Sequence, residues 1–250
     1  MMPRVVAAET LDGLAEDDPA AMRSRRDLRR IHRVMGTRGI MLRALQKLML
    51  SRPAAAPLRI LELGAGDGSL MLGVARALQG HWPAVEITLL DRQRLVSRPT
   101  LAGYARLGWQ ATPQVMDVFD WASSRESERP GHVARWDAIV ANLFLHHFEG
   151  PQLATLLAAI ESRTESFLAC EPRRARLALA GSHLVGAMGA NAVTREDAVL
   201  SVHAGFRDSE ISALWPGNRA GWTLGEYPAG LFSHCFCAQR SDLEAAAAPS

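Results

Sequence analysis

The sequence lacks an uninterrupted apolar run long enough to cross a membrane. No run approaches the roughly 18 apolar residues that suggest a membrane span. The first residues, from Met1 to Glu9, also lack an adequate apolar core for a signal peptide. These two absences predict a cytoplasmic protein without a membrane partner.

Cysteine is scarce as well. The 250-residue chain contains three cysteines, Cys170, Cys235 and Cys237, and all lie in apolar runs. An odd set in such surroundings predicts buried thiols rather than a disulfide framework. The closely spaced pair Cys235 and Cys237 has neither metal-ligand spacing nor partner ligands, so we expect no metal site there or elsewhere.

Aromatic residues are absent before Trp82, although this part of the chain is strongly basic. Residues 23–52 carry ten Lys or Arg against the single acid Asp27, so their net charge is +9 and that of the remaining chain is −7. Such a block invites a nucleic-acid interpretation. Because aromatic stacking platforms for bases are missing, we interpret the arginines mainly as a solvated helix face and disfavour nucleic acid as a partner.

A short apolar run that breaks into alternate glycines organises the rest of the chain. Residues 59–69 read RILELGAGDGS, and apolar residues then recur at helical spacing up to Gly80. Glycine permits turn angles closed to other residues and lets a ligand approach the main chain. In an open α/β sheet this turn lies at the carboxyl end of a strand, where ligands bind. A tight turn without a ligand has the same local pattern.

The glycine spacing distinguishes between ligands. A dinucleotide fingerprint places its third glycine or an alanine at position 69, where this chain has Ser69. The observed E-x-G-x-G-x-G, from Glu62 to Gly68, resembles the first motif of class I S-adenosylmethionine (SAM)-dependent methyltransferases. This form disfavours a NAD-dependent oxidoreductase.

Later strands also end in polar residues. Asp91 follows the apolar run that starts at Val85, and a carboxylate there can accept two hydrogen bonds from a ribose diol or cap a helix. A third strand is predicted around 114–118. The fourth, 136–142, runs into the sequence LFLHHF, and together they resemble the fourth motif of small-molecule methyltransferases.

The resemblance covers residues 58–240 and implies an α/β fold. We expect a seven-stranded, mostly parallel, doubly wound sheet that ends in an antiparallel hairpin from strands 222–226 and 231–238. Residues 1–52 are expected to form an N-terminal arm, loose over residues 1–20, and a helical cap that offers a homodimer contact. A methyltransferase domain spans 53–240 with a helical substrate-pocket insert at 173–216, and residues 241–250 form a disordered tail.

The resemblance also implies SAM as cofactor and the residues that bind it. Expected contacts follow the order of the strands: Glu62, Gly64, Ala65, Gly66 and Gly68 at the amino-acid end, Asp91 and Arg92 at the ribose, Asp117 and Val118 at the adenine, and Asn142 and Leu143 beside the methionine.

Residues for the acceptor come from the second half of the chain. His146 and His147 are candidates for a general base, because histidine is the side chain most often suited to proton transfer near neutral pH. Consecutive residues point differently, so at most one faces the acceptor; the alternative is packing and helix capping. Expected substrate contacts are Met188, Asn191 and Arg195. The helical cap is expected to cover this pocket as a lid, with three methionines, Met22, Met35 and Met41.

The predicted function is methyl transfer from SAM to a small apolar or aromatic acceptor of natural-product type, with oxygen as the favoured atom. One alternative is an RNA methyltransferase that uses residues 23–52, although Asn142 is followed by Leu143 rather than by the prolines of an N-P-P-Y signature. The other is a catalytically silent methyltransferase-like partner protein.

Overall fold

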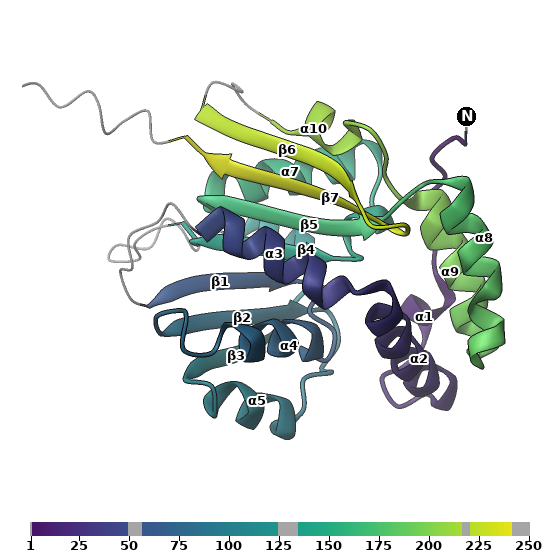
Figure 1. Ribbon diagram of the computed structural model, residues 1–250, viewed down its shortest axis with the longest axis horizontal. Coiled ribbons are helices and arrows are strands. Elements are labelled where there is room, and N and C mark those ends of the chain that lie inside the picture. Colours follow the sequence, from purple (N-terminus) through teal and green to yellow (C-terminus); the bar gives the residue numbers. More distant parts are fainter. Residues whose placement is uncertain (1, 50–56, 125–134, 217–220, 242–250) are drawn as a thin grey trace, which may run out of the picture.

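A single mixed sheet forms the centre of the protein (Figure 1). The computed structural model describes residues 2–49, 57–124, 135–216 and 221–241. Its strands are β1 (Leu58–Leu63), β2 (Val85–Asp91), β3 (Trp109–Val115), β4 (Ala138–Asn142), β5 (Ser166–Pro172), β6 (Trp222–Ala229) and β7 (Ser233–Arg240). They lie in the order β3-β2-β1-β4-β5-β7-β6; β7 pairs antiparallel with both β5 and β6, and the other pairs are parallel. This arrangement confirms the predicted seven-stranded sheet and its C-terminal hairpin.

Alternate side chains of the parallel strands build two hydrophobic layers. Ile60 packs on one face of β1, whereas Leu61 and Leu63 pack on the other, as the alternation of a strand requires. Both faces are therefore apolar, which explains the continuous hydrophobic runs. The first face is covered by α3 (Thr37–Met49), α4 (Ser69–Leu78) and α5 (Arg98–Ala105), and the second by α6 (Val118–Ser123), α7 (Gly150–Arg163) and α10 (Glu210–Leu214).

A third group of helices gathers beyond the carboxyl ends of the parallel strands, at the right of Figure 1. It contains α1 (Thr10–Gly13), α2 (Pro19–Met35), α8 (Arg176–Leu184), α9 (Ala192–Ala204) and the 3-10 turn η3 (Val185–Met188), while a second turn, η2 (Leu145–His147), follows β4. Helix α9 contacts α1, α2 and α8. Among the described helices, none has the length and apolarity needed to cross a bilayer.

The predicted helical cap divides between two places. Gly36, at φ 68°, ends α2 in the left-handed conformation that commonly closes a helix and redirects the chain. Helix α3 then lies on the sheet, where Met41 and Leu45 are fully buried in the same core as β5 side chains. Only α2 therefore remains above the strand ends, and α3 is a structural layer of the sheet.

The prediction that residues 1–20 form a loose arm was wrong. The Val5 amide donates to the carbonyl of His203 at 3.1 Å, and the Arg4 guanidinium donates to the carbonyls of Ala204 and Phe148, each at 2.8 Å. Asp197 accepts the next two amide hydrogen bonds, from residues 10 and 11. These contacts join positions between 144 and 200 residues apart and leave no periodic pattern in the sequence.

The third strand lies earlier than predicted. β3 ends at Val115, so Asp117 and Val118 start α6 instead of ending a strand. β3 is an edge strand with exposed and half-buried side chains and an internal proline, Pro113, a residue that edge strands tolerate. Its weak hydrophobic alternation explains the misplaced boundary. The hairpin strands likewise extend further than predicted, to Ala229 and Arg240.

Candidate functional site

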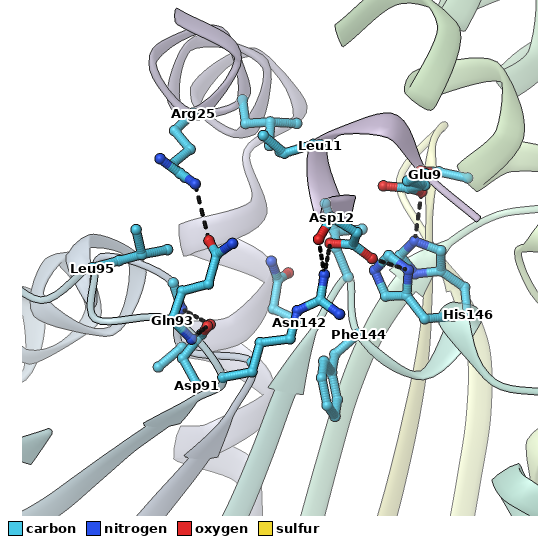
Figure 2. Close-up of a pocket in the computed structure, with 18 of the residues that line it drawn as sticks. Glu9, Leu11, Asp12, Arg25, Asp91, Gln93, Leu95, Asn142, Phe144 and His146 are labelled. Carbon is cyan, nitrogen blue, oxygen red and sulfur yellow. Dashed lines mark hydrogen bonds and ion pairs between the residues drawn. The ribbon is translucent and has the colours of Figure 1, made fainter. Parts of the chain in front are cut away.

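A cavity of about 740 Å³ opens at the carboxyl ends of β1, β2 and β4. Figure 2 shows side chains from the strand ends below it and from the N-terminal segment and α2 above it. We define the N-terminal segment as residues 4–16. Nearly all residues predicted to bind cofactor line this cavity: Glu62, Gly64, Ala65, Gly66, Asp91, Arg92, Asp117, Val118, Asn142 and Leu143.

The glycine loop after β1 forms the floor of the cavity. Gly64, Gly66 and Gly68 have φ angles of 65°, 56° and 70°, in the left-handed region that L residues rarely adopt. A Cβ on Gly64 would also lie only 2.4 Å from the ring of Phe144. Gly68 lies outside the lining: it precedes α4, and its carbonyl accepts the Tyr104 hydroxyl at 2.9 Å. Gly68 therefore shapes the turn, while Gly64 and Gly66 expose their main-chain atoms to the cavity.

Asp91 fastens the end of β2 to the glycine loop. Its Oδ2 accepts the Gly66 amide at 2.8 Å and its Oδ1 accepts the Gln93 amide at 2.9 Å. Burial raises the pKa of Asp91 in spite of these bonds. Because each carboxylate oxygen has two lone pairs, both oxygens keep an acceptor position for a further donor. The neighbouring Arg92 instead turns to Asp12, whose carboxylate is 3.5 Å away.

Two buried acceptor atoms on the cavity wall lack partners. Glu62 Oε2 and Asn142 Oδ1 make no hydrogen bond within the described part of the chain. Burial, with the negative charges of Asp67 and Asp91, holds the pKa of Glu62 well above its usual range. Buried polar groups are normally hydrogen-bonded, so these two residues, which line the cavity, are left with unused acceptor capacity.

The adjoining strand ends complete this part of the cavity. Asp117 caps α6, because its Oδ1 accepts the Phe119 amide at 2.7 Å. Leu143, directly after β4, adopts a φ of 48°, a strained conformation for a branched side chain. Such strain tends to occur at functional sites, where the surrounding structure imposes it.

Both predicted histidines line the cavity, but their surroundings differ. His146 is buried, with Nδ1 at 2.9 Å from Glu171 and Nε2 at 3.2 Å from Glu9. Burial acts to lower the pKa of His146, yet the hydrogen bonds to Glu171 and Glu9 outweigh it and raise this pKa to about 9. His147 places Nδ1 at 3.3 Å from Asp12, and burial together with the charge of His146 lowers its pKa.

The acids around these histidines were missed by sequence reasoning. Glu171 accepts the amides of residues 144–146 at 3.0 to 3.3 Å, and it lies at the carboxyl end of β5, where the rule that selected Asp91 also applies. Glu9 also accepts the Ser201 hydroxyl. Burial acts to raise the pKa of Glu9, but the hydrogen bond and charge of His146 outweigh it and lower that pKa. No periodicity marks Glu9 or Asp12.

Helix α2 closes the cavity from above. Arg29 forms an ion pair with Asp67 at 2.7 Å, and Arg25 donates to the Gln93 side chain at 2.9 Å, visible in Figure 2. His32 also faces the cavity, where burial lowers its pKa to about 4. The expected lid methionines, in contrast, are not among the described lining residues: Met22 is half exposed and Met41 lies in the core under α3, and Met35 is likewise outside the lining.

The three expected substrate contacts also lie outside the lining that the described residues form. Asn191 caps α9, accepting the Thr194 amide and donating to the carbonyl of Ala20, both at 2.9 Å. Met188 is 41% exposed on η3, and Arg195 lies against Gly186. Because α9 turns this face toward α2 and solvent, the insert instead contributes Ser201 to the cavity.

Solved structures of two methyltransferases share this fold. The plantazolicin methyltransferase BpumL in complex with SAH is 13% identical, with 90% of this chain and 92% of that chain covered at a TM-score of 0.57. The plantazolicin methyltransferase BamL, in complex with a triazolic desmethylPZN analog and SAH, is 12% identical, with coverage of 93% and 94% and a TM-score of 0.62. No family model and no curated protein matches the chain. The likeness confirms the predicted methyltransferase fold.

Proposed function

We propose that this protein is a SAM-dependent methyltransferase that methylates an oxygen atom of a small apolar or aromatic molecule. The observation that carries the proposal is the cavity at the strand ends, which combines bare glycine main chain, the Asp91 carboxylate and two unpaired buried acceptors. Its volume of about 740 Å³ is typical of a pocket for molecules of this size. The methyltransferase fold of the chain supports the same function.

The residues present fit SAM along its whole length. Asp91 keeps acceptor positions for a ribose diol, and the unpaired oxygens of Glu62 and Asn142 suit the donors of an ammonium group. We assign Asp117 and Val118, which also line the cavity, to the adenine. Bound SAM supplies an electrophilic methyl group on a sulfonium, so the chain mainly has to hold the acceptor in line and exclude water.

The other end of the cavity fits an apolar acceptor with one polar atom. The cavity as a whole is lined by the apolar side chains of Val6, Leu11, Leu28, Phe144 and Phe148. His147 provides the polar contact that a hydroxyl group needs, because both ring nitrogens of His146 already face Glu171 and Glu9. We place the acceptor hydroxyl beside His147, with its ring or chain against the aromatic wall.

Methyl transfer from isotopically labelled SAM into a metabolite extract tests this function. The wild-type protein is expected to label a small molecule of low polarity, identifiable by mass, and Asp91→Ala is expected to reduce that labelling by at least about tenfold. Label found in RNA would favour the alternative that uses the basic face of α2. Labelling of nothing, in extracts from several sources, would contradict catalytic activity.

A further inference from the structure

Three metal-binding side chains from distant parts of the chain meet at the acceptor end of the cavity. Glu9 comes from the N-terminal segment, whereas His146 and His147 follow β4. One ligand atom of each lies within 4.8 Å of the others. Figure 2 shows Glu9, Asp12 and His146 directed toward one another at this end.

One separation in this cluster matches that of ligands that share one ion, and the others lie within reach of it. Nitrogen and carboxylate ligands lie about 2.0 to 2.2 Å from Zn²⁺, so neighbouring ligand atoms are about 3.0 Å apart around an octahedral ion and about 3.4 Å apart around a tetrahedral ion. His146 Nε2 and Glu9 Oε1 are 3.2 Å apart. The two imidazole centroids are 4.2 Å apart. The outer limit of 4.8 Å falls to the tetrahedral spacing when the ligand atoms approach one another by about 1.4 Å.

Each of the three side chains is also held by a second residue. Glu171 accepts from His146 Nδ1 at 2.9 Å, and Asp12 lies 3.3 Å from His147 Nδ1. Ser201 donates its hydroxyl to Glu9. Metal-ligating histidines usually donate the second ring N–H to a carboxylate, which fixes the tautomer and aims the other nitrogen at the ion. His146 makes this hydrogen bond to Glu171, which is itself fixed by three main-chain amides, and His147 has the Asp12 carboxylate within ion-pair distance.

We propose that Glu9, His146 and His147 bind one divalent cation of the borderline class, such as Zn²⁺ or Co²⁺. Two imidazoles and one carboxylate favour these ions over Ca²⁺ or Mg²⁺, which prefer oxygen ligands. All three ligands line the cavity, so the remaining coordination positions open toward the space assigned to the acceptor. An oxygen donor such as a hydroxyl group is the ligand class expected there.

A bound ion would also activate the acceptor hydroxyl, and only this role of the metal site rests on the proposed function. A hydroxyl bound to a divalent cation loses its proton to water more readily, because the positive charge stabilises the oxygen anion. With the ion bound, the two histidines act as its ligands. Because Glu9 lies 137 residues before His146, the ion also joins the N-terminal segment to the end of β4.

Metal titration of the full-length protein tests the site directly. After removal of metals with a chelator, titration with Co²⁺ followed by visible absorption, and with Zn²⁺ followed by calorimetry, is expected to show about one ion per chain at a Kd below about 10 μM. His147→Ala and Glu9→Gln are expected to weaken binding more than about 100-fold, and Asp12→Asn about 10- to 100-fold. His81→Ala, which removes an exposed histidine remote from the cavity, is expected to change nothing.

The outcomes separate this inference from the proposed function. Calorimetry with S-adenosylhomocysteine (SAH) and a thermal melt of every variant establish that each remains folded with its cofactor end intact. Substoichiometric binding of Zn²⁺ and Co²⁺, or equal affinity in His147→Ala and wild type, overturns the metal site even when SAH binds. One ion per chain with no SAH binding supports the metal site and contradicts the proposed function.

Discussion

Replacement of Asp91 by alanine tests the proposal that this carboxylate binds the ribose of SAM. The Asp91 carboxylate already accepts the amides of Gly66 and Gln93, at 2.8 and 2.9 Å, which aims its remaining lone pairs into the cavity. Hydrogen bonds to a charged group contribute about 1.5 to 3 kcal/mol net. Loss of the ribose bonds is therefore expected to raise the Kd for SAH about 10- to 150-fold, since about 1.4 kcal/mol corresponds to a factor of ten.

Calorimetry with two ligands isolates the ribose contribution from the effect on the loop. Asp91→Ala also removes the acceptor of the Gly66 amide, so a weaker affinity alone does not identify the contact. A 2′,3′-dideoxy analogue of SAH should bind wild type about 10- to 150-fold more weakly than SAH, whereas Asp91→Ala should bind both ligands almost equally.

The matched control is Glu86→Ala, which removes an exposed acid from the same strand. It is expected to leave both affinities unchanged. Equal discrimination between the two ligands by wild type and Asp91→Ala would refute the ribose assignment, whatever the absolute affinities.

Three further changes test the loop, α2 and the N-terminal segment. Both Gly64→Ala and Gly66→Ala incur about 1 to 2 kcal/mol of left-handed strain, but only the new Cβ of Gly64→Ala meets the Phe144 ring. In urea unfolding, the free energy of unfolding of Gly64→Ala should therefore be lower than that of Gly66→Ala by at least about 1 kcal/mol. Equal losses in the two variants would contradict this. The pKa of His32 is about 4 when folded, below its ordinary 6.5, so the unfolded chain binds more protons between these values and stability falls as pH falls through that window. His32→Leu should reduce the difference in the free energy of unfolding between pH 7 and pH 4.5 by up to about 3 kcal/mol. An unchanged difference would show that another group binds the proton. Arg4→Met removes the donors to the Ala204 and Phe148 carbonyls and should increase amide hydrogen exchange in residues 5–13 at least about tenfold; unchanged exchange would show that Arg4 does not hold the segment.

The sequence predicts that the residues we assign to the cofactor lie together, because each is marked by a short local pattern. The glycine loop, Asp91 and Asn142 each follow a buried strand directly, and parallel strands bring their carboxyl ends to one edge of the sheet. The order of strands thus converts three separated motifs into one site. The two histidines were found in the same way, at the end of β4.

The acceptor end could not be predicted because it depends on contacts between distant segments. Glu9 and Asp12 reach the histidines only after the N-terminal segment docks against α9 through Asp197 and main-chain bonds. Such polar contacts have no hydrophobic period, so residues 1–20 were mistaken for a loose arm. Asn191 shows the opposite case: the sequence predicts a substrate contact, but its side chain caps α9 instead.

Titration of SAH into the purified protein tests the central claim most directly, because it does not depend on knowing the acceptor. The cavity predicts saturable binding of about one SAH per chain, a raised melting temperature, and a large loss of affinity in Asp91→Ala with little change in Glu86→Ala. No heat of binding and no thermal shift at about 1 mM SAH would show that the cavity does not hold this cofactor, and methyl transfer at this site would then be contradicted.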